Sequence, residues 1–521
     1  MTRPTAPSSI ASSPVASSLA APSISTASIS TRPAVGSSRF ATTLIAALVS
    51  ALFLSLIGAS GSKPATAEDW PQFRGVNCSG RAATDKALPT EIAPDRNVAW
   101  KTALPPGHSS PVVVGDRIYL TGVRDERLVT IALDRATGKL LWEVVAPHEK
   151  LEQVHSIGSH AQSSPVADDE RVISFFGSSG MFCYDRDGKL QWQHRMGPFN
   201  NDFGAASSPV LVGDKIVLCQ DHDTDSFLMA LDKRTGKIAW KTDRREFPRN
   251  FCSPVVWDND GKKQIVIAAT LRVAGYDLET GLESWTVRGI SRTVCMTPVV
   301  GDDNILYVAG WAAGGDKEEP IRVGPFAEAL EKLDLNKNGT LEENELGDSP
   351  FKQRFTQVDR DNDDRLSREE YEFFRSLFEQ GRNLVLAIKP GAKGDASATS
   401  VLWTHDRFVP FCASPLYYRN LVFTVKDGGI VTCLDAKSGK SLKSGRLPNT
   451  GSYYASPVAG DGKVFMLNQD GKLSVLAATG DWKVVHSADF AEDCYATPAL
   501  VDGRVYLRTA GFLYCFGAAS K

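Results

Sequence analysis

The sequence predicts an all-β fold, an eight-bladed β-propeller, from a motif that recurs eight times and from a last repeat that lacks one strand. Each repeat spans about forty residues, the length of one propeller blade. It opens at a Ser-Pro or Thr-Pro pair, where a strand begins, followed by a turn rich in Gly and Asp and a second β-branched strand. The eight openings start at Ser109, Ser163, Ser207, Cys252, Met296, Ala413, Ala455 and Ala496.

The second half of the repeat is as regular as the first. In "ALDRATGKLLW" a third strand ends at an Asp, a turn closes on a Gly that is free to take positive φ, and a fourth strand ends at Trp142. The tryptophans recur with the repeat, so we expect them to pack between blades and to hold no cofactor. They are Trp142, Trp192, Trp240, Trp285 and Trp403.

The last blade is predicted to be completed by the N-terminal part of the chain. The eighth repeat stops at "LYCFGAASK" and has no fourth strand. The segment "NVAWKTAL" (97–104) places Trp100 where the other fourth strands place theirs. Pairing of this strand with the last repeat closes the ring and leaves no long exposed sheet edge.

A helical module interrupts the fifth repeat. The predicted propeller comprises 68–310 and 383–521, and the inserted module comprises 311–382. The propeller resumes with "NLVLAIK". Within the interruption, "DLNKNGTLEENE" (334–345) has the ligand spacing of an EF-hand calcium loop, with Gly339 at its sharp turn. Positions 1, 3, 5, 7, 9 and 12 of this loop are Asp334, Asn336, Asn338, Thr340, Glu342 and Glu345.

A second loop, "DRDNDDRLSREE" (359–370), repeats the spacing, with ligands Asp359, Asp361, Asp363, Arg365 (through its carbonyl) and Glu370. Asp364 stands where the first loop has Gly339, and a non-Gly residue at positive φ costs about 1 kcal/mol or more. Leu341 and Leu366, both at position 8, should form a short β contact. A separate apolar core is expected from Phe351, Phe355, Val358, Tyr371, Phe374 and Phe378.

These oxygen-rich loops predict calcium as the cofactor, because carboxylate and amide oxygens suit it better than zinc or copper. Between Asp316 and Glu379, eighteen acidic residues against ten basic ones give the module a net charge of −8. We therefore expect it to be loosely packed without calcium and compact with it.

The N-terminal residues 1–67 predict export. A Ser/Ala/Pro-rich tract with too few large apolar residues for a core reads as disordered. After Arg39 come an apolar run and "PATA", in which Ala65 and Ala67 fit a signal-peptide cleavage site. We expect cleavage after Ala67 and a periplasmic or extracellular protein. The alternative is an uncleaved anchor, the one case in which we expect membrane association.

The net charge limits the classes of partner, and the cysteine pattern predicts the state of the thiols. The net charge of −3 argues against nucleic acid, and we expect a monomer. All nine cysteines follow the cleavage site, and no C-x-x-C occurs. Cys183, Cys433 and Cys515 fill a repeat position that is Ala elsewhere, which predicts buried free thiols although the compartment would allow disulfides.

The motif A-x-D-x-x-T-G-K-x-x-W is similar to the tryptophan-docking motif of pyrroloquinoline quinone (PQQ) repeat propellers. That superfamily contains quinoprotein alcohol dehydrogenases and a periplasmic lipoprotein that assists outer-membrane barrel assembly. "DWPQFRG" (69–75) resembles the mature N-terminal signature of secreted bacterial PQQ-like propeller proteins, several of which carry EF-hands. The resemblance covers about 69–520 outside the insert, and implies a propeller of the quinoprotein/PQQ-repeat type with an inserted EF-hand pair.

The resemblance also makes PQQ a second candidate cofactor, at the channel mouth on a calcium ion held by Glu, Asn and Asp, with an Asp as base. The EF-hand pair should overhang the same mouth. We expect this face to gather polar side chains from the segments that lead into the inner strands: His108, His160, Asn201, Asp202, Arg249, Asn250, Arg292, His405, Arg407, Tyr453, Tyr454, Asp493 and Tyr495.

Two functions remain open on the sequence. The first is a binding or scaffold module with a protein or polysaccharide on the channel face. The second is a PQQ-dependent dehydrogenase that oxidises an alcohol or sugar. Adjacent cysteines and a haem motif, both common in such dehydrogenases, are absent from the sequence, so we favour the first. No catalytic or PQQ-binding residue is assigned.

Overall fold

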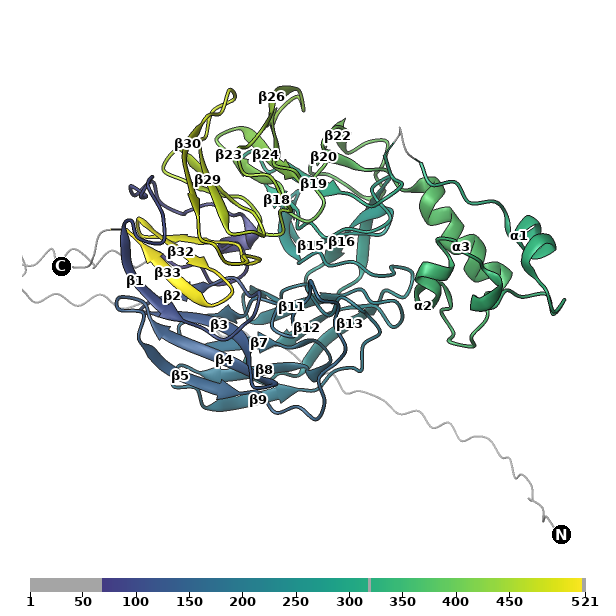
Figure 1. The fold of residues 1–521 in the computed structure, drawn as a ribbon, viewed down its shortest axis with the longest axis horizontal. Coiled ribbons are helices and arrows are strands. Elements are labelled where there is room, and N and C mark those ends of the chain that lie inside the picture. The colour runs from purple at the N-terminus through teal and green to yellow at the C-terminus, as the bar shows by residue number, and fades with distance from the viewer. Residues whose placement is uncertain (1–67, 317–319, 518–521) are drawn as a thin grey trace, which may run out of the picture. The chain divides into compact units, whose positions relative to one another are not determined.

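The computed structural model describes residues 68–316 and 320–517. The predicted disordered tract and signal peptide therefore lie outside the described residues. The described residues form eight sheets, each with the strand order expected of a blade (Figure 1). All pairings within a blade are antiparallel except one short parallel pair in blade 4. The predicted eight-bladed propeller is confirmed.

Blades 1 to 4 follow one another in the first half of the chain. Blade 1 contains β2 (Val112–Val114), β3 (Arg117–Arg124), β4 (Arg127–Asp134) and β5 (Leu140–Val145). Blade 2 contains β6 (Val166–Ala167), β7 (Arg171–Phe175), β8 (Met181–Asp185) and β9 (Leu190–His194). Blade 3 contains β10 (Val210–Val212), β11 (Lys215–Gln220), β12 (Phe227–Asp232) and β13 (Ile238–Asp243). Blade 4 contains β14 (Val255–Asn259), β15 (Lys262–Ala269), β16 (Arg272–Asp277), β17 (Glu283–Arg288) and the added β21 (Gly394–Asp395).

Blades 5 to 8 occupy the second half. Blade 5 contains β18 (Val299–Val300), β19 (Leu306–Gly310), β20 (Leu384–Ile388) and β22 (Val401–His405). Blade 6 contains β23 (Leu416–Tyr418), β24 (Leu421–Lys426), β25 (Ile430–Asp435) and β26 (Ser441–Arg446). Blade 7 contains β27 (Val458–Gly460), β28 (Lys463–Leu467), β29 (Lys472–Ala477) and β30 (Val484–Asp489). Blade 8 contains β31 (Ala499–Val501), β32 (Arg504–Arg508), β33 (Phe512–Phe516) and β1 (Val98–Ala103).

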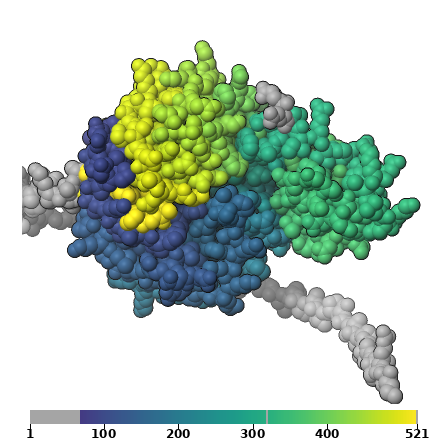
Figure 2. All heavy atoms as spheres, in the orientation of Figure 1, coloured from purple at the N-terminus to yellow at the C-terminus, as the bar shows by residue number. Residues whose placement is uncertain are grey.

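The N-terminal strand closes the ring as predicted. β1 pairs antiparallel with β33, and Trp100 lies opposite Cys515. In Figure 2 the purple N-terminal segment lies against the yellow C-terminal strands. Closure removes the free edge that the three-stranded last repeat would otherwise expose.

The Ser/Thr-Pro pairs connect the eight inner strands through a closed ring of hydrogen bonds. The backbone N–H of each Ser or Thr donates to the hydroxyl of its counterpart in the next blade, at 2.9–3.2 Å, and the eighth donates back to the first. An inner strand has no neighbour on the channel side, so its first N–H needs a partner outside its own sheet. The following Pro has no N–H to leave unpaired. The ring consists of Ser110, Ser164, Ser208, Ser253, Thr297, Ser414, Ser456 and Thr497.

The outer strands are joined by the tryptophans. The indole Nε1–H of Trp142 donates to the carbonyl of Arg186 in the next blade, and Trp192, Trp240, Trp403 and Trp100 make the equivalent bond, at 2.6–3.3 Å. Each ring lies on the turn Gly of that blade. A Cβ at Gly236 would lie 2.5 Å from the Trp192 ring.

Trp285 does not follow the predicted pattern. Its Nε1–H donates to Gln264 within its own blade at 2.7 Å, and its ring packs edge-on against Trp257. Trp257 makes the bond to the next blade instead, donating to the carbonyl of Asn304 at 3.0 Å. Blade 5 offers no Thr-Gly turn here because β21 pairs with the outer edge of β17.

The segment that carries "DWPQFRG" lies across the inner strands of the propeller. Trp70 pairs with Val113, and the Pro71 carbonyl accepts from the Ala167 N–H. Three further bonds reach blades 3, 4 and 6: Leu211 N–H to Gln72 Oε1 at 3.0 Å, Val256 N–H to Asn77 Oδ1 at 2.7 Å, and Arg74 Nη2–H to the Pro415 carbonyl at 2.9 Å. The motif is therefore structural: it crosses the channel and ties inner strands together.

The insert between β19 and β20 contains the expected helices. They are α1 (Phe326–Leu333), α2 (Phe355–Val358) and α3 (Arg368–Gln380), with single 3-10 turns η3 (Glu343–Glu345) and η4 (Lys352–Arg354); two others, η1 (Val76–Cys78) and η2 (Gly177–Ser179), lie in the propeller. No long helix follows the first loop: η3 ends at Glu345, the last loop position, Gly347 takes a positive φ of 57°, and Pro350 follows. All six predicted core residues are buried together there.

Two remaining expectations concern the thiols and the membrane. All nine cysteines are free, and seven of them are buried. The prediction of free thiols is confirmed, although Cys295 and Cys412 are only half-buried. Within the part of the chain that the structure describes, the helices are too short and too polar to span a bilayer.

The tryptophan contact can be tested with two glycines that both have positive φ, Gly236 (68°) and Gly213 (61°). Gly213→Ala should cost about 1 kcal/mol of unfolding free energy, since nothing lies within 4 Å of the added Cβ. Gly236→Ala should cost at least about 2 kcal/mol, because the methyl group also displaces Trp192. Urea denaturation measures both. Equal losses would contradict the docking role of the indole.

Candidate functional site

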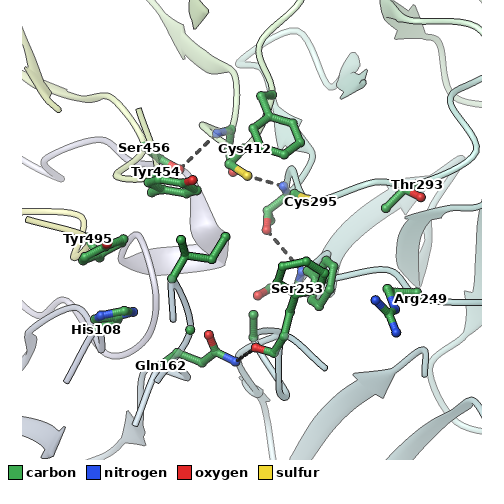
Figure 3. A pocket seen from close by; sticks show the side chains of 18 of the residues that line it. His108, Gln162, Arg249, Ser253, Thr293, Cys295, Cys412, Tyr454, Ser456 and Tyr495 are labelled. Carbon is green, nitrogen blue, oxygen red and sulfur yellow. Dashed lines mark hydrogen bonds between the residues drawn. The ribbon is translucent and has the colours of Figure 1, made fainter. Parts of the chain in front are cut away.

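A cavity of about 420 Å³ lies at the end of the channel where the inner strands begin. All eight blades contribute to it through the residues at and just before their Ser/Thr-Pro pairs. The ring hydroxyls line its deep part, and Phe73, from the crossing N-terminal segment, lines it as well. Its upper part is formed by larger side chains, several of which Figure 3 labels.

One side of the cavity is an aromatic wall. The His108 imidazole stacks on Tyr495, with ring centroids 3.9 Å apart and planes 15° from parallel, and Tyr454 lies 5.4 Å from Tyr495. Figure 3 shows these three rings together, on the side away from Arg249. Burial and the charge of Arg508 lower the pKa of His108 to about 4, so the imidazole is neutral at pH 7.

The rest of the upper cavity is mostly apolar. Trp311 and Phe411 meet edge to face at 4.9 Å, and Phe203 and Phe251 do so at 6.3 Å. Rings arranged in this way offer flat faces and edges to a ligand with a ring system.

Two thiols from neighbouring blades also line the cavity. Contact with the Cys295 thiol, together with burial, raises the pKa of Cys412 well above its usual range. The Cys412 thiol therefore stays protonated at neutral pH, and thiolate chemistry is disfavoured at this position.

Three arginines give the other side a positive charge. Arg249 is neutralised: it donates to Asp223 with Nε at 2.7 Å, and Nη2 lies 3.3 Å from Asp202. Arg292 and Arg354 also line the cavity, but no carboxylate among the described residues lies within ion-pairing distance of either. Burial and the neighbouring Arg354 lower the pKa of Arg292 to about 10.

The donor set of the cavity is short of metal ligands. Among the described residues that line it there is no Asp, Glu or Asn; the polar groups are hydroxyls, thiols, two Gln, one neutral His and the arginines. The ring hydroxyls already accept backbone hydrogen bonds. A divalent cation prefers several carboxylate or carbonyl oxygens, so this cavity is a poor calcium site.

The two loops of the insert have the opposite chemistry. In the first, the Asp334 carboxylate accepts from the amides of Asn338 and Gly339, at 3.2 and 3.0 Å. The Glu345 carboxylate reaches back to the amides of Leu335 and Glu342, at 2.8 and 3.0 Å. Backbone amides of the loop therefore orient the side-chain oxygens at positions 1 and 12.

The second loop repeats these bonds residue for residue. Asp359 accepts from Asp363 and Asp364, at 3.2 and 3.0 Å, and Glu370 accepts from Arg360 at 2.7 Å. Carboxylate oxygens of Asp359, Asp361 and Asp363 all lie within 4.8 Å of one another. Asp364 takes the positive φ, 62°, that its place in the loop demands. Leu341 and Leu366 form the expected β bridge between the loops.

Five of the thirteen polar residues expected on the channel face do line the cavity: His108, Arg249, Arg292, Tyr454 and Tyr495. Others are used elsewhere in the fold. Asn250 donates to Thr270 and accepts from Val294, and Tyr453 donates to the Asn449 carbonyl. Neither His160, which bonds the Glu152 carbonyl, nor His405, which bonds that of Arg407, lines the cavity.

The Phe and Trp side chains of the cavity were not expected from the sequence, where polar groups and tyrosines alone were singled out. The sequence position could have identified two of them: Phe251 stands two positions before Ser253 of the ring, and Phe411 stands three positions before Ser414. Arg354 and Gln357, which belong to the insert, line the cavity too. The insert therefore reaches the channel mouth, as expected from the sequence.

The lowered pKa of His108 gives a pH test. In the unfolded chain His108 binds a proton below about pH 6.5. In the folded chain its lowered pKa delays protonation until about pH 4. His108 therefore stabilises the fold above that window and costs up to about 3 kcal/mol as the pH falls through it. His108→Gln should lose less stability than wild type between pH 6.5 and 4. The exposed His155→Gln should follow wild type; identical slopes for all three would refute the assignment.

Comparison with known proteins agrees with this architecture. The family model described as outer membrane protein assembly factor BamB, a PQQ-repeat model, matches residues 83–202, 161–312 and 377–520. No curated protein matches the chain. BamB from Moraxella catarrhalis is similar in structure, with a TM-score of 0.50 and 13% identity over 81% of this chain and 99% of that one.

A quinohemoprotein alcohol dehydrogenase from Pseudomonas putida HK5 is similar to the same degree. Its TM-score is 0.51 at 13% identity, over 87% of this chain and 81% of that one. BamB and an alcohol dehydrogenase thus share this fold, and at such identity the likeness concerns the fold alone. Since the family model matches more than half of its length, the chain belongs to the family of PQQ-repeat β-propellers described as outer membrane protein assembly factor BamB.

Proposed function

We propose that this protein is an exported, calcium-binding PQQ-like propeller that acts as a binding module and not as a dehydrogenase. The observation that carries the proposal is the lining of the channel cavity, which is aromatic and cationic and has no carboxylate among the described residues. Such a cavity can hold a ligand, but it offers neither a metal-binding carboxylate nor a carboxylate base.

The group implied by the resemblance, PQQ on a calcium ion, does not fit these residues. That arrangement needs Glu, Asn and Asp around the ion and an Asp base beside the substrate. The positions nearest the channel axis are hydroxyls that already accept a backbone N–H, and His108 is stacked and neutral.

Calcium is assigned to the insert. Each loop presents oxygens at the EF-hand positions, with the position-1 Asp and the position-12 Glu oriented by backbone amides. The bridge between Leu341 and Leu366 joins the loops, so binding in one should favour binding in the other. A protein or polysaccharide on the face around the cavity remains the proposed partner. A periplasmic or extracellular location suits millimolar calcium.

A reconstitution experiment tests the dehydrogenase alternative. Purified full-length protein is mixed with PQQ and calcium, and dye reduction is followed with a panel of alcohols and sugars. We expect no turnover, because the cavity has no carboxylate base. Calcium-dependent dye reduction with any member of the panel would overturn the proposal.

Calcium titration with paired variants tests the metal assignment. Wild type should bind two calcium ions. Glu370→Gln should lower the calcium affinity of the second loop by roughly tenfold or more, because the bidentate ligand loses its charge. The control is Glu369→Gln, which removes a charge from an exposed neighbour at no ligand position. A similar loss in both variants, or two unchanged sites in Glu370→Gln, would show that the loops act only as an acidic surface.

A further inference from the structure

We infer that the channel cavity binds a small ligand with a ring-bearing apolar body and a carboxylate, and that Arg292 and Arg354 hold the carboxylate. This names the ligand class of the binding function proposed above and rests on it. Arg292 comes from the link between blades 4 and 5, and Arg354 from η4 of the insert, so the two cations approach the cavity from separate parts of the chain.

The charge balance of the cavity points to an anion. Of its three arginines, Arg249 already has two acidic partners, Asp223 and Asp202. Arg292 and Arg354 have none among the described residues, although each is close enough to another arginine for its pKa to be lowered by that charge as well as by burial. Two partly desolvated like charges destabilise one another, and an anion between them removes that cost.

The Arg292 guanidinium is held in place and still has hydrogen-bond donors without a partner among the described residues. Its plane lies over the Phe378 ring of α3, 4.5 Å from the centroid, and Nη2 donates to the Ala313 carbonyl at 3.3 Å. Its buried Nε has no partner. Arg354 Nη1 donates one long hydrogen bond, 3.5 Å, to the Pro350 carbonyl. A guanidinium fork with free N–H groups suits the planar, two-oxygen geometry of a carboxylate.

The remaining walls select the body of the ligand. Tyr454 and Tyr495, the latter stacked on His108, form one wall, and Trp311 and Phe411 are also part of the lining. A volume of about 420 Å³ is within the range of small-molecule sites, about 300–1,000 Å³, and Phe73 lies in the lining on the channel side. These dimensions favour a small molecule over a polymer chain threading the channel.

Arg354 also couples the cavity to the proposed calcium loops. η4 continues directly into α2 (Phe355–Val358), and the residue after α2 is Asp359, the first ligand of the second loop. A calcium ion that fixes Asp359 therefore fixes the turn that carries Arg354. By linkage, calcium should raise carboxylate affinity, and a bound carboxylate should raise calcium affinity by the same factor.

The test compares each acid with its uncharged amide, which has nearly the same shape. Full-length protein saturated with calcium is titrated calorimetrically with indole-3-acetate against indole-3-acetamide, and with 3-phenylpropionate against 3-phenylpropionamide. We expect at least one acid to bind about tenfold more tightly than its amide, because charge-assisted hydrogen bonds form only with the acid. If both amides bind as tightly as their acids, or nothing binds at millimolar concentration, the inference is wrong.

Variants locate the charge that is responsible. Arg354→Gln and Arg292→Gln should each abolish the preference for the acid while leaving the affinity for the amide. Lys352→Gln is the matched control, since it removes an exposed charge from the same turn as Arg354 without lining the cavity. Circular dichroism checks that each variant is folded. Retention of the preference in both arginine variants would overturn the inference, whereas failure of the calcium titration alone would overturn only the proposed calcium function.

Discussion

The fold depends on the closed ring of eight hydrogen bonds between Ser and Thr residues at the start of the inner strands. Each bond joins one blade to the next, and the last, from Thr497 to Ser110, joins residues almost four hundred positions apart in the chain. The ring resolves the problem that every inner strand faces, an N–H with no strand beside it on the channel side. A hydroxyl at this position accepts that N–H, and the Pro that follows has none to satisfy.

This ring also explains why the cavity has the lining it has. The ring hydroxyls already accept the backbone N–H groups that join the blades, so the remaining chemistry at this level comes from the residues just outside the ring. There the chain supplies rings, thiols and arginines. Negative charge is concentrated in the insert, away from the ring, where backbone amides support the carboxylates. The proposed metal and the proposed organic ligand therefore occupy separate places, linked through η4 and α2.

The repeat made most of the fold predictable. Blade number, the closing strand and the thiols followed from a spacing that recurs eight times, and the two loops followed from a pattern fixed by ligand geometry. The exceptions were places where the repeat is broken. Trp285 differs from the other tryptophans because β21 pairs with its strand, and no long helix follows the first loop, where Gly347 takes a positive φ. The channel-crossing role of "DWPQFRG" is invisible in sequence, since its partners are spread over Val113 to Pro457. The cavity was predicted in position but not in chemistry, because which of two adjacent residues faces the channel depends on backbone geometry.

We propose that calcium binds to the insert and that the channel cavity is a metal-free binding site. Crystals grown in calcium and measured at a long X-ray wavelength, where calcium scatters anomalously, would test it most directly. We expect two anomalous peaks, one beside Asp334 and Glu345 and one beside Asp359 and Glu370, with none in the cavity. A peak within the cavity, among the ring hydroxyls, would contradict it.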